Sequence, residues 1–542
     1  MPPANPPIKK PADATKKRPR KPAARRKSKT AAPYSVESVG LDAFLYVPGR
    51  LVPAVVQILT VTVLTYWFTV EEIGGYDLAF RFVLFLSTFT FMWVNMAVLR
   101  FYAPYEAREA RVFAPVTGLI RYGATGLGVV ITVVVYATGM AKPLGVPGEL
   151  LLPGLAVFIG YSFYECGLAV LRAKHRPITY SVATTLNAGL RLPLAIGCFV
   201  WLHMGVEGML WSMAATYLLA HVLILARHLG WPGALETQER KKLFRDILDY
   251  GLPIWLTQVL NFFLINLDRW LINLLGTTAE NGLAGVGLYS VATTLVDQPV
   301  TLVFQTFTLA VFPSVVALWE KHGKEATEDL LKGLTRLYFL LCLPLVVFFT
   351  MLANPIFQVL AHGEARTAYS ASGWIATASF FYGLSYFASF GLHVSKRTKL
   401  LLAATVFALL INVAANAFLI PREGFLGAAQ ARLISNFVLT AAVAAAGHRF
   451  LRWRLPLISF LRIFAAALAA GGAAWLLAYF VAVNVVSLAL ILSAAALLYF
   501  LFLLFLRELT SQGVAESASQ VLTRLRGTKD RGRRDSRDNR TR

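Results

Sequence analysis

The chain has 542 residues, of which 57% are hydrophobic and 15% charged, and its mean hydropathy is +0.59. This composition excludes an ordinary soluble globular protein and indicates an integral membrane protein. The formal net charge of +23 resembles that of a nucleic-acid-binding protein, but 11 Lys and Arg fall in residues 1–34 and 10 in residues 507–542, at the two ends of the chain.

The two basic ends, residues 1–40 and 508–542, are rich in Pro, Ala, Ser or Asp and have no apolar periodicity. Such segments are typically disordered, and their charge favours contact with anionic lipid at the cytoplasmic surface. RNA binding is a weaker alternative, so no nucleic acid is expected among the partners. The three cysteines stand alone within apolar runs and predict neither a disulfide framework nor a metal site.

Between these ends the sequence predicts an all-α membrane protein with about 14 spanning helices, because each span needs roughly 20 mostly apolar residues. The predicted spans are 46–69, 76–100, 113–137, 150–172, 178–203, 206–227, 250–275, 284–316, 333–352, 371–394, 400–420, 425–447, 456–481 and 484–506. They divide into two six-helix bundles and a C-terminal helix pair. The predicted segments are bundle one at 41–228, a cytoplasmic linker at 229–248, bundle two at 249–448, and helices 13–14 at 449–507.

Charge in the loops predicts the orientation. Loops after even-numbered helices contain 20 Lys and Arg, whereas loops after odd-numbered helices contain three. By the positive-inside rule, this asymmetry places both termini in the cytoplasm of a multi-pass membrane protein. A missed span would disturb the alternation, so the loop charges also support the helix count.

An internal repeat relates the two bundles. I-G-G-Y at 73–76 matches V-G-L-Y at 286–289, and M-A-V at 96–98 matches L-A-V at 309–311, both at a shift of 213 residues. G-E recurs at 148–149 and 363–364. Because each half has six helices, both halves start with the same orientation and form parallel repeats, as in alternating-access transporters. The glycines at 74, 75, 285 and 287 predict a tight turn and a close helix approach at the start of each second helix.

Several stretches resemble a known family. D-R-W-L-I-N-L-L-G (268–276), V-G-L-Y-S-V-A (286–292), T-V-E-E-I-G-G-Y-D-L-A (69–79) and N-P-I-F-Q-V-L-A-H-G-E-A (354–365) are similar to segments of bacterial Wzx-type polysaccharide flippases. These form the polysaccharide-transport branch of the multidrug/oligosaccharidyl-lipid/polysaccharide (MOP) exporter superfamily, which also contains lipid II flippases and MATE exporters. The resemblance covers about residues 40–450. Fourteen predicted helices rather than twelve are a departure that resembles the lipid II flippases.

This resemblance implies two V-shaped bundles and a flippase for polyprenyl-diphosphate-linked oligosaccharide, such as an exopolysaccharide or O-antigen unit. The substrate would cross the bacterial inner membrane by alternating access, with Na⁺ or H⁺ as the candidate coupling ion. Implied partners are the lipid-linked oligosaccharide, membrane lipids, and polysaccharide polymerase or export proteins.

Arginines inside the predicted spans are candidate binding residues, because a charge at the centre of a membrane helix costs about 3 kcal/mol even on the translocon-insertion scale. Six arginines and three carboxylates inside the spans are singled out as candidates, which is an excess of cations. An arginine-rich cavity suits a diphosphate, which the guanidinium group binds through a planar fork. The predicted substrate-binding residues are Arg50, Arg81, Arg121, Arg191 and Arg269, and the sixth arginine is Arg432. The alternative for those near helix ends is that they extend to lipid headgroups.

Three carboxylates inside the spans, Asp268, Glu165 and Asp297, are candidate coupling or gating groups, or else ion-pair partners of the arginines. Adjacent helical residues point about 100° apart, so Asp268 and Arg269 need separate partners. Asp268 is the first candidate for cation coupling. The alternative is a salt bridge between Asp268 and an arginine of the other bundle.

No glycine-rich nucleotide loop, zinc-ligand spacing or large soluble domain is present in the sequence. We therefore predict a transporter that is not an enzyme and has no cofactor other than a coupling ion. The alternatives are a lipid II flippase, a MATE-like cation-coupled small-molecule exporter, and a scaffold that recruits glycan enzymes through its tails.

Overall fold

A computed structural model of the chain describes residues 48–105, 112–226, 238–276 and 282–508, with the backbone alone at 306–314, 317 and 322. The predicted tail at 1–40 and residues 509–542 of the other tail lie outside these ranges. Within the described residues the regular elements are all helices, which confirms the predicted fold class.

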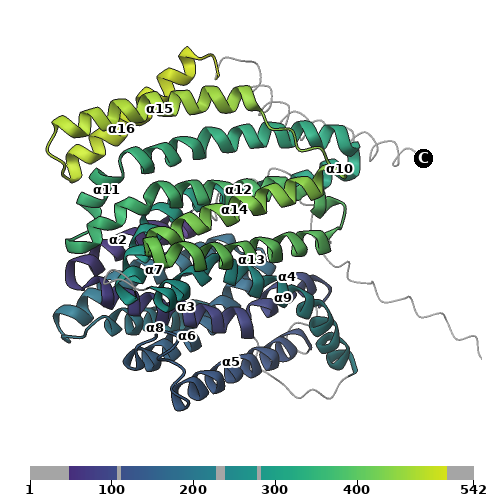
Figure 1. The fold of residues 1–542 in the computed structure, drawn as a ribbon. Helices are drawn as coiled ribbons and strands as arrows, with labels where there is room; N and C mark the ends of the chain where they lie inside the picture. The colour runs from purple at the N-terminus through teal and green to yellow at the C-terminus, as the bar shows by residue number, and fades with distance from the viewer. Residues whose placement is uncertain (1–47, 106–111, 227–237, 277–281, 509–542) are drawn as a thin grey trace, which may run out of the picture.

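The first half of the fold contains seven long or medium helices (Figure 1). They are α2 (Pro48–Trp67), α3 (Val70–Thr90), α4 (Met92–Tyr105), α5 (Ala114–Ala137), α6 (Leu151–Ala173), α7 (Pro177–Val200) and α8 (Glu207–Ala220). The short 3₁₀ helix η3 (Gly148–Leu150) precedes α6, and the short π-helix η4 (His221–Leu225) continues α8.

The second half begins with two long helices. Its elements are α9 (Gln238–Leu275), α10 (Leu283–Met351), α11 (Ala353–Leu360), η6 (Gly363–Ala371), α12 (Ser372–Val394), α13 (Thr398–Glu423) and α14 (Phe425–His448). A final pair, α15 (Leu457–Phe480) and α16 (Val485–Phe505), completes the described fold.

Twelve of the described helices are long and apolar enough to cross a membrane, and a thirteenth span results when the bent pair of α3 and α4 is taken as one. The first part of α10 covers the predicted span 284–316. Gly323, with φ of 76°, ends this part and separates it from the span that runs to Met351. The predicted number of 14 is therefore approximate, whereas the order of the elements follows the prediction.

Two helices begin earlier than the predicted spans. The second span starts at Val70 rather than at 76, because Thr69 and Glu72 form a capping box in which each side chain accepts the other residue's backbone N–H. The same span bends by 43° between α3 and α4. Helix α9 begins at Gln238, inside the predicted linker, because Leu243 and Ile247 form an apolar face that packs against α4.

The two halves meet along α3, α9 and α10 (Figure 1). Helix α3 packs along α10, and α9 crosses from the second half to contact α3 and α4. Trp255 of α9 donates from its indole N–H to the carbonyl of Phe89, at 2.7 Å. These contacts bring charged residues of α3 and α9 together at the boundary between the repeats.

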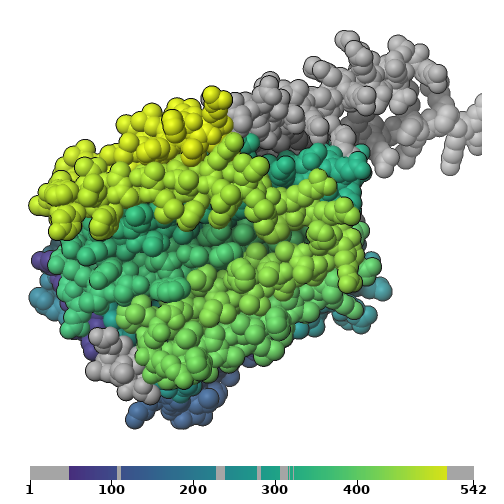
Figure 2. Space-filling model, turned by 45° about the horizontal axis from the view of Figure 1, so that its top comes forward, coloured from purple at the N-terminus to yellow at the C-terminus, as the bar shows by residue number. Residues whose placement is uncertain are grey.

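The C-terminal pair α15–α16 lies against α10, on the side away from the first half (Figures 1 and 2). Glu508, just beyond α16, is only 1% exposed and pairs with Arg336 of α10 at 2.6 Å and with Arg462 of α15 at 3.6 Å. The end of the described chain is thus fixed to the second half by a buried carboxylate.

Candidate functional site

The repeated glycines lie where α3 and α10 cross. A Cβ atom on Gly74 would stand 1.9 Å from the carbonyl oxygen of Leu283, and one on Gly287 would stand 1.9 Å from that of Val70. The two repeat-related positions therefore face each other across the boundary between the halves. The predicted close approach is confirmed, but the predicted turn is wrong, because both glycines lie inside helices.

One turn further along α3, Asp77 binds two arginines. Its carboxylate pairs with Arg81 of the same helix at 3.1 Å and with the Nε of Arg269 on α9 at 2.7 Å. Arg269 also donates to the hydroxyl of Thr293 at 2.8 Å, and Arg81 to the side-chain oxygen of Asn266 at 3.3 Å. Asp77 and Arg269 are each 3% exposed. We call this group the Asp77 bridge; it joins the halves and carries one positive charge in excess.

Asp77 is a site residue that the sequence reading missed. Asp77 lies one residue inside the predicted span 76–100 but is not among the three carboxylates singled out as candidates. The signal that could have identified it is the four-residue spacing from Arg81, which places the two side chains on one helix face.

Arg191 lies on α7 in the first half. It donates to the side-chain oxygen of Asn187 at 2.8 Å and to the hydroxyl of Tyr217 at 3.2 Å. Tyr76 is within electrostatic range of both Arg191 and Asp77. The Nε of Arg191 and the Nδ2 of Asn187 are buried without a hydrogen-bond partner, so this region retains unused donors.

Arg50 makes another connection between the halves, donating from α2 to the side-chain oxygen of Gln305 on α10 at 3.1 Å. Glu165 forms no ion pair within 4.0 Å in the described part of the chain, and the charges acting on it are Arg172 and Arg50. Glu165 is thus placed among arginines without direct contact.

Arg121 lies apart from the other predicted binding arginines. Its side chain is 4% exposed, contacts the Sγ of Cys166 at 3.7 Å and lies over the rings of Tyr122 and Phe163. The five predicted binding arginines therefore do not form one cluster. The structure brings Arg81 and Arg269 together through Asp77.

Asp268 is completely buried and is held by neutral groups. Tyr289 donates its hydroxyl to the carboxylate at 2.8 Å, and the amides of Asn416 and Asn412 donate at 2.9 and 3.1 Å. The side-chain oxygen of Asn416 is buried without a hydrogen-bond partner. The prediction that Asp268 and Arg269 have separate partners is confirmed. Of the two residues, Arg269 forms the inter-bundle salt bridge and Asp268 does not.

Asp297 forms an ion pair with Arg432 at 2.8 Å and accepts a hydrogen bond from Ser379 at 2.5 Å. This pair joins α10 to α14 and α12. Asp297 thus has the arginine partner that the sequence offered as the alternative to coupling. Among the described residues, no group of three or more His, Cys, Asp or Glu is arranged to hold a metal ion.

Comparison with known proteins identifies a family for this chain. The family model described as polysaccharide biosynthesis protein matches residues 63–364. Comparison with curated proteins gives no match. The fold resembles the structure of the lipid II flippase MurJ in an inward closed conformation, with a TM-score of 0.68, 15% identity, and coverage of 87% of this chain and 99% of that one.

Two further structures share the core of the fold. An inward-facing multidrug resistance MATE family transporter has a TM-score of 0.55 and 16% identity, covering 78% of this chain and 96% of its own. A MOP superfamily transporter from Pyrococcus furiosus has a TM-score of 0.54 and 16% identity, covering 77% and 96%. Family and fold together point to a membrane flippase or transporter rather than a catalytic enzyme. The chain belongs to the polysaccharide biosynthesis protein family, with the MurJ- and MATE-like fold of the MOP superfamily.

Proposed function

We propose that this protein moves a polyprenyl-diphosphate-linked oligosaccharide from the inner to the outer leaflet of the bacterial inner membrane. The observation that carries the proposal is the Asp77 bridge, in which Arg81 and Arg269 share one carboxylate at the boundary between the halves. A diphosphate binds guanidinium groups in the same bidentate manner as a carboxylate and offers them more oxygen acceptors. Its binding would therefore compete for the contacts that join the two halves.

This competition provides a route from binding to alternating access. Arg81 is the more accessible of the two arginines, with a side chain 17% exposed, whereas that of Arg269 is 4% exposed. We infer that Arg81 contacts the diphosphate first and that Arg269 remains with Asp77 until the halves separate. Arg191, with its unused Nε, would bind the next anionic or hydroxyl group of the cargo.

Replacing Arg81 by glutamine is expected to slow translocation roughly 10- to 100-fold, since a hydrogen bond to a charged group contributes about 1.5–3 kcal/mol. The measurement is a leaflet assay in proteoliposomes with a fluorescent undecaprenyl-diphosphate oligosaccharide. R81K should recover part of the rate, and R422Q, which removes an exposed charge at the end of α13, should leave it unchanged. A wild-type rate in R81Q would contradict the proposed role of the bridge.

The same assay separates the proposed substrate from the alternatives. Lipid II carries a peptide that an exopolysaccharide precursor lacks, so preferential translocation of lipid II would favour the lipid II flippase. Gradient-driven uptake of a small organic cation, without movement of either lipid, would favour a MATE-like exporter.

Asp268 is the proposed coupling residue. A buried carboxylate is costly without a compensating charge, and its direct hydrogen-bond partners here are all neutral. The unpartnered oxygen of Asn416 adds a second potential ligand oxygen beside it. Oxygen atoms are the ligands that hard cations prefer, so Na⁺, or a proton on the carboxylate, would supply a positive charge in direct contact with Asp268.

Replacing Asp268 by asparagine should abolish any acceleration of translocation by a Na⁺ or proton gradient. The variant keeps the side-chain shape but removes the charge that the ion neutralises. The rate is measured with each gradient imposed separately, and D329N, at an exposed site on α10, is the matched control. Retention of the gradient dependence in D268N would show that coupling resides elsewhere.

The proposed orientation places both termini in the cytoplasm. After replacement of the native cysteines Cys166, Cys198 and Cys342, a cysteine at position 358 should react with an impermeant maleimide in intact cells. A cysteine at position 329 should react only after the membrane is permeabilised. The reverse labelling pattern would invert the topology.

A further inference from the structure

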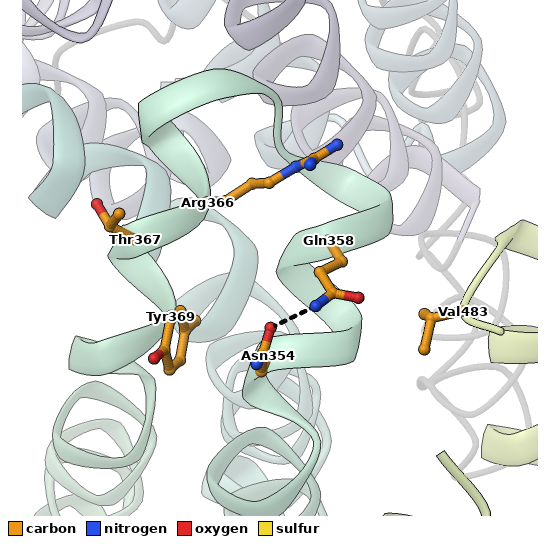
Figure 3. A pocket seen from close by; sticks show the side chains of 6 residues that line it. All are labelled: Asn354, Gln358, Arg366, Thr367, Tyr369 and Val483. Carbon is orange, nitrogen blue, oxygen red and sulfur yellow. Dashed lines mark hydrogen bonds between the residues drawn. The ribbon is translucent and has the colours of Figure 1, made fainter. Parts of the chain in front are cut away.

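A cavity of about 340 Å³ lies between the second half and the tip of the C-terminal helix pair (Figure 3). It is lined by Asn354, Gln358, Arg366, Thr367, Tyr369 and Val483. In the proposed orientation it opens at the outer surface. None of the arginines and carboxylates already discussed lines it, and its volume falls at the lower end of the 300–1,000 Å³ typical of small-molecule sites.

Three elements build this cavity. Helix α11 places Asn354 and Gln358 four residues apart on one face, while Ile356 and Phe357 on its other side are buried. The two amides are hydrogen-bonded to each other at 2.9 Å. In Figure 3 they stand between the side chains of η6 and Val483, which comes from the connection of α15 to α16. The helix pair therefore supplies one wall.

The η6 wall of the cavity is also polar. Thr367 adds a hydroxyl, and Tyr369, which is 41% exposed, adds a phenol and an accessible ring face. Arg366 donates from its Nε to the carbonyl of Ala361 at 3.1 Å, which orients the guanidinium group. Amides, hydroxyls and an aromatic ring are the groups that bind sugars. Arg366 is the only charged residue among the six that line the cavity, and none of them carries a carboxylate.

We propose that this cavity binds the glycan part of the cargo at the outer surface, through a sugar unit that carries a carboxylate. The inference rests on the proposed function and narrows its substrate to acidic glycans. The amides and Tyr369 would hold the hydroxyls and ring, and Arg366 would bind the carboxylate in the bidentate manner of guanidinium groups. The proposal also assigns a role to α15–α16, because Val483 in their connection forms one wall of the site.

The test measures binding of free disaccharides to the purified full-length protein. The probes are a disaccharide containing one uronic acid and the matching neutral disaccharide, followed by ligand-observed NMR. We expect the acidic probe to bind at least tenfold more tightly. V483W should fill the cavity and weaken this binding at least tenfold, whereas V481W, at an exposed position two residues away in the same connection, should leave it unchanged.

Two further variants test the assigned contacts. R366Q should remove the preference for the acidic probe while retaining weak binding of both probes. Q358L should weaken the binding of both probes to a similar extent. Glycerol phosphate, which has an anion like that of a lipid headgroup but no sugar ring, should not displace the acidic probe. Displacement by glycerol phosphate, equal binding of the two probes, or unaltered binding in V483W would overturn the proposal.

Failure of this inference and failure of the proposed function give different results. If the wild-type protein translocates lipid-linked glycans but V483W binds the free acidic probe normally, only the cavity assignment fails. If V483W loses the probe but the wild-type protein translocates no lipid-linked glycan, the binding site stands and the flippase proposal fails.

Discussion

Replacing Gly287 by alanine is expected to reduce translocation by roughly five- to 100-fold. The new Cβ would lie 1.9 Å from the carbonyl oxygen of Val70, and the obstacle is helix backbone rather than a flexible side chain. Overpacking of this kind costs about 1–3 kcal/mol or more, and each 1.4 kcal/mol lowers the population of the closed arrangement about tenfold. Helices α3 and α10 must then move apart, so the halves can no longer close as they do in this structure.

The measurement combines the leaflet assay with hydrogen exchange of α3 and α10, whose amides should exchange faster in G287A. G126A is the matched control, because Gly126 lies inside α5 and a Cβ there would meet no atom within 4 Å. The reciprocal variant G74A should behave like G287A, since its Cβ would meet the carbonyl of Leu283 at the same distance. Wild-type translocation and exchange in both variants would show that the glycine contact is not needed for closure.

Replacing Asp77 by asparagine should destabilise the protein by about 3–5 kcal/mol, the usual cost of removing one partner from a buried ion pair. Here the loss leaves two guanidinium groups, on Arg81 and Arg269, without an anion. The free energy of unfolding is measured by denaturant titration in detergent, alongside translocation. E71Q, an exposed carboxylate on the same helix, should change it by less than about 0.5 kcal/mol.

A double-mutant cycle tests whether the bridge joins the halves. D77N and R269Q should together cost clearly less than the sum of the single changes, because Arg269 no longer remains as an unpaired buried charge. Strict additivity would mean that the two side chains do not interact in the folded protein, in conflict with their 2.7 Å contact.

The sequence predicted the helical class, the order of the spans and the close approach of the repeated glycines, because hydrophobic runs and internal similarity are local signals. It was less accurate at helix boundaries. Thr69 extends α3 through its cap, and Leu243 and Ile247 draw the predicted linker into α9 by packing against α4. The capping of α3 and the packing of α9 against α4 depend on contacts that a hydropathy profile does not show.

The candidate site was only partly predictable. Helical geometry alone required separate partners for Asp268 and Arg269, and the structure supplies them. Helical geometry could not identify those partners, because Asp77 lies 192 residues away from Arg269 and Asn416 lies 148 residues away from Asp268. Arg121 was included among the binding arginines because depth in a span was the available criterion, yet it packs against Cys166 and two aromatic rings.

The membrane-spanning helical chain, its repeat and the expected distribution of charge across the membrane can therefore be predicted without a structure. Each follows from short-range composition or from self-similarity. Which buried charges meet is known only from the folded arrangement of the helices. The free energy of a charge in the membrane depends on the groups within a few ångströms of it, and those groups come from helices far apart in the chain. Asp77, between two arginines, and Asp268, among neutral amides and a phenol, have the same side chain in opposite surroundings.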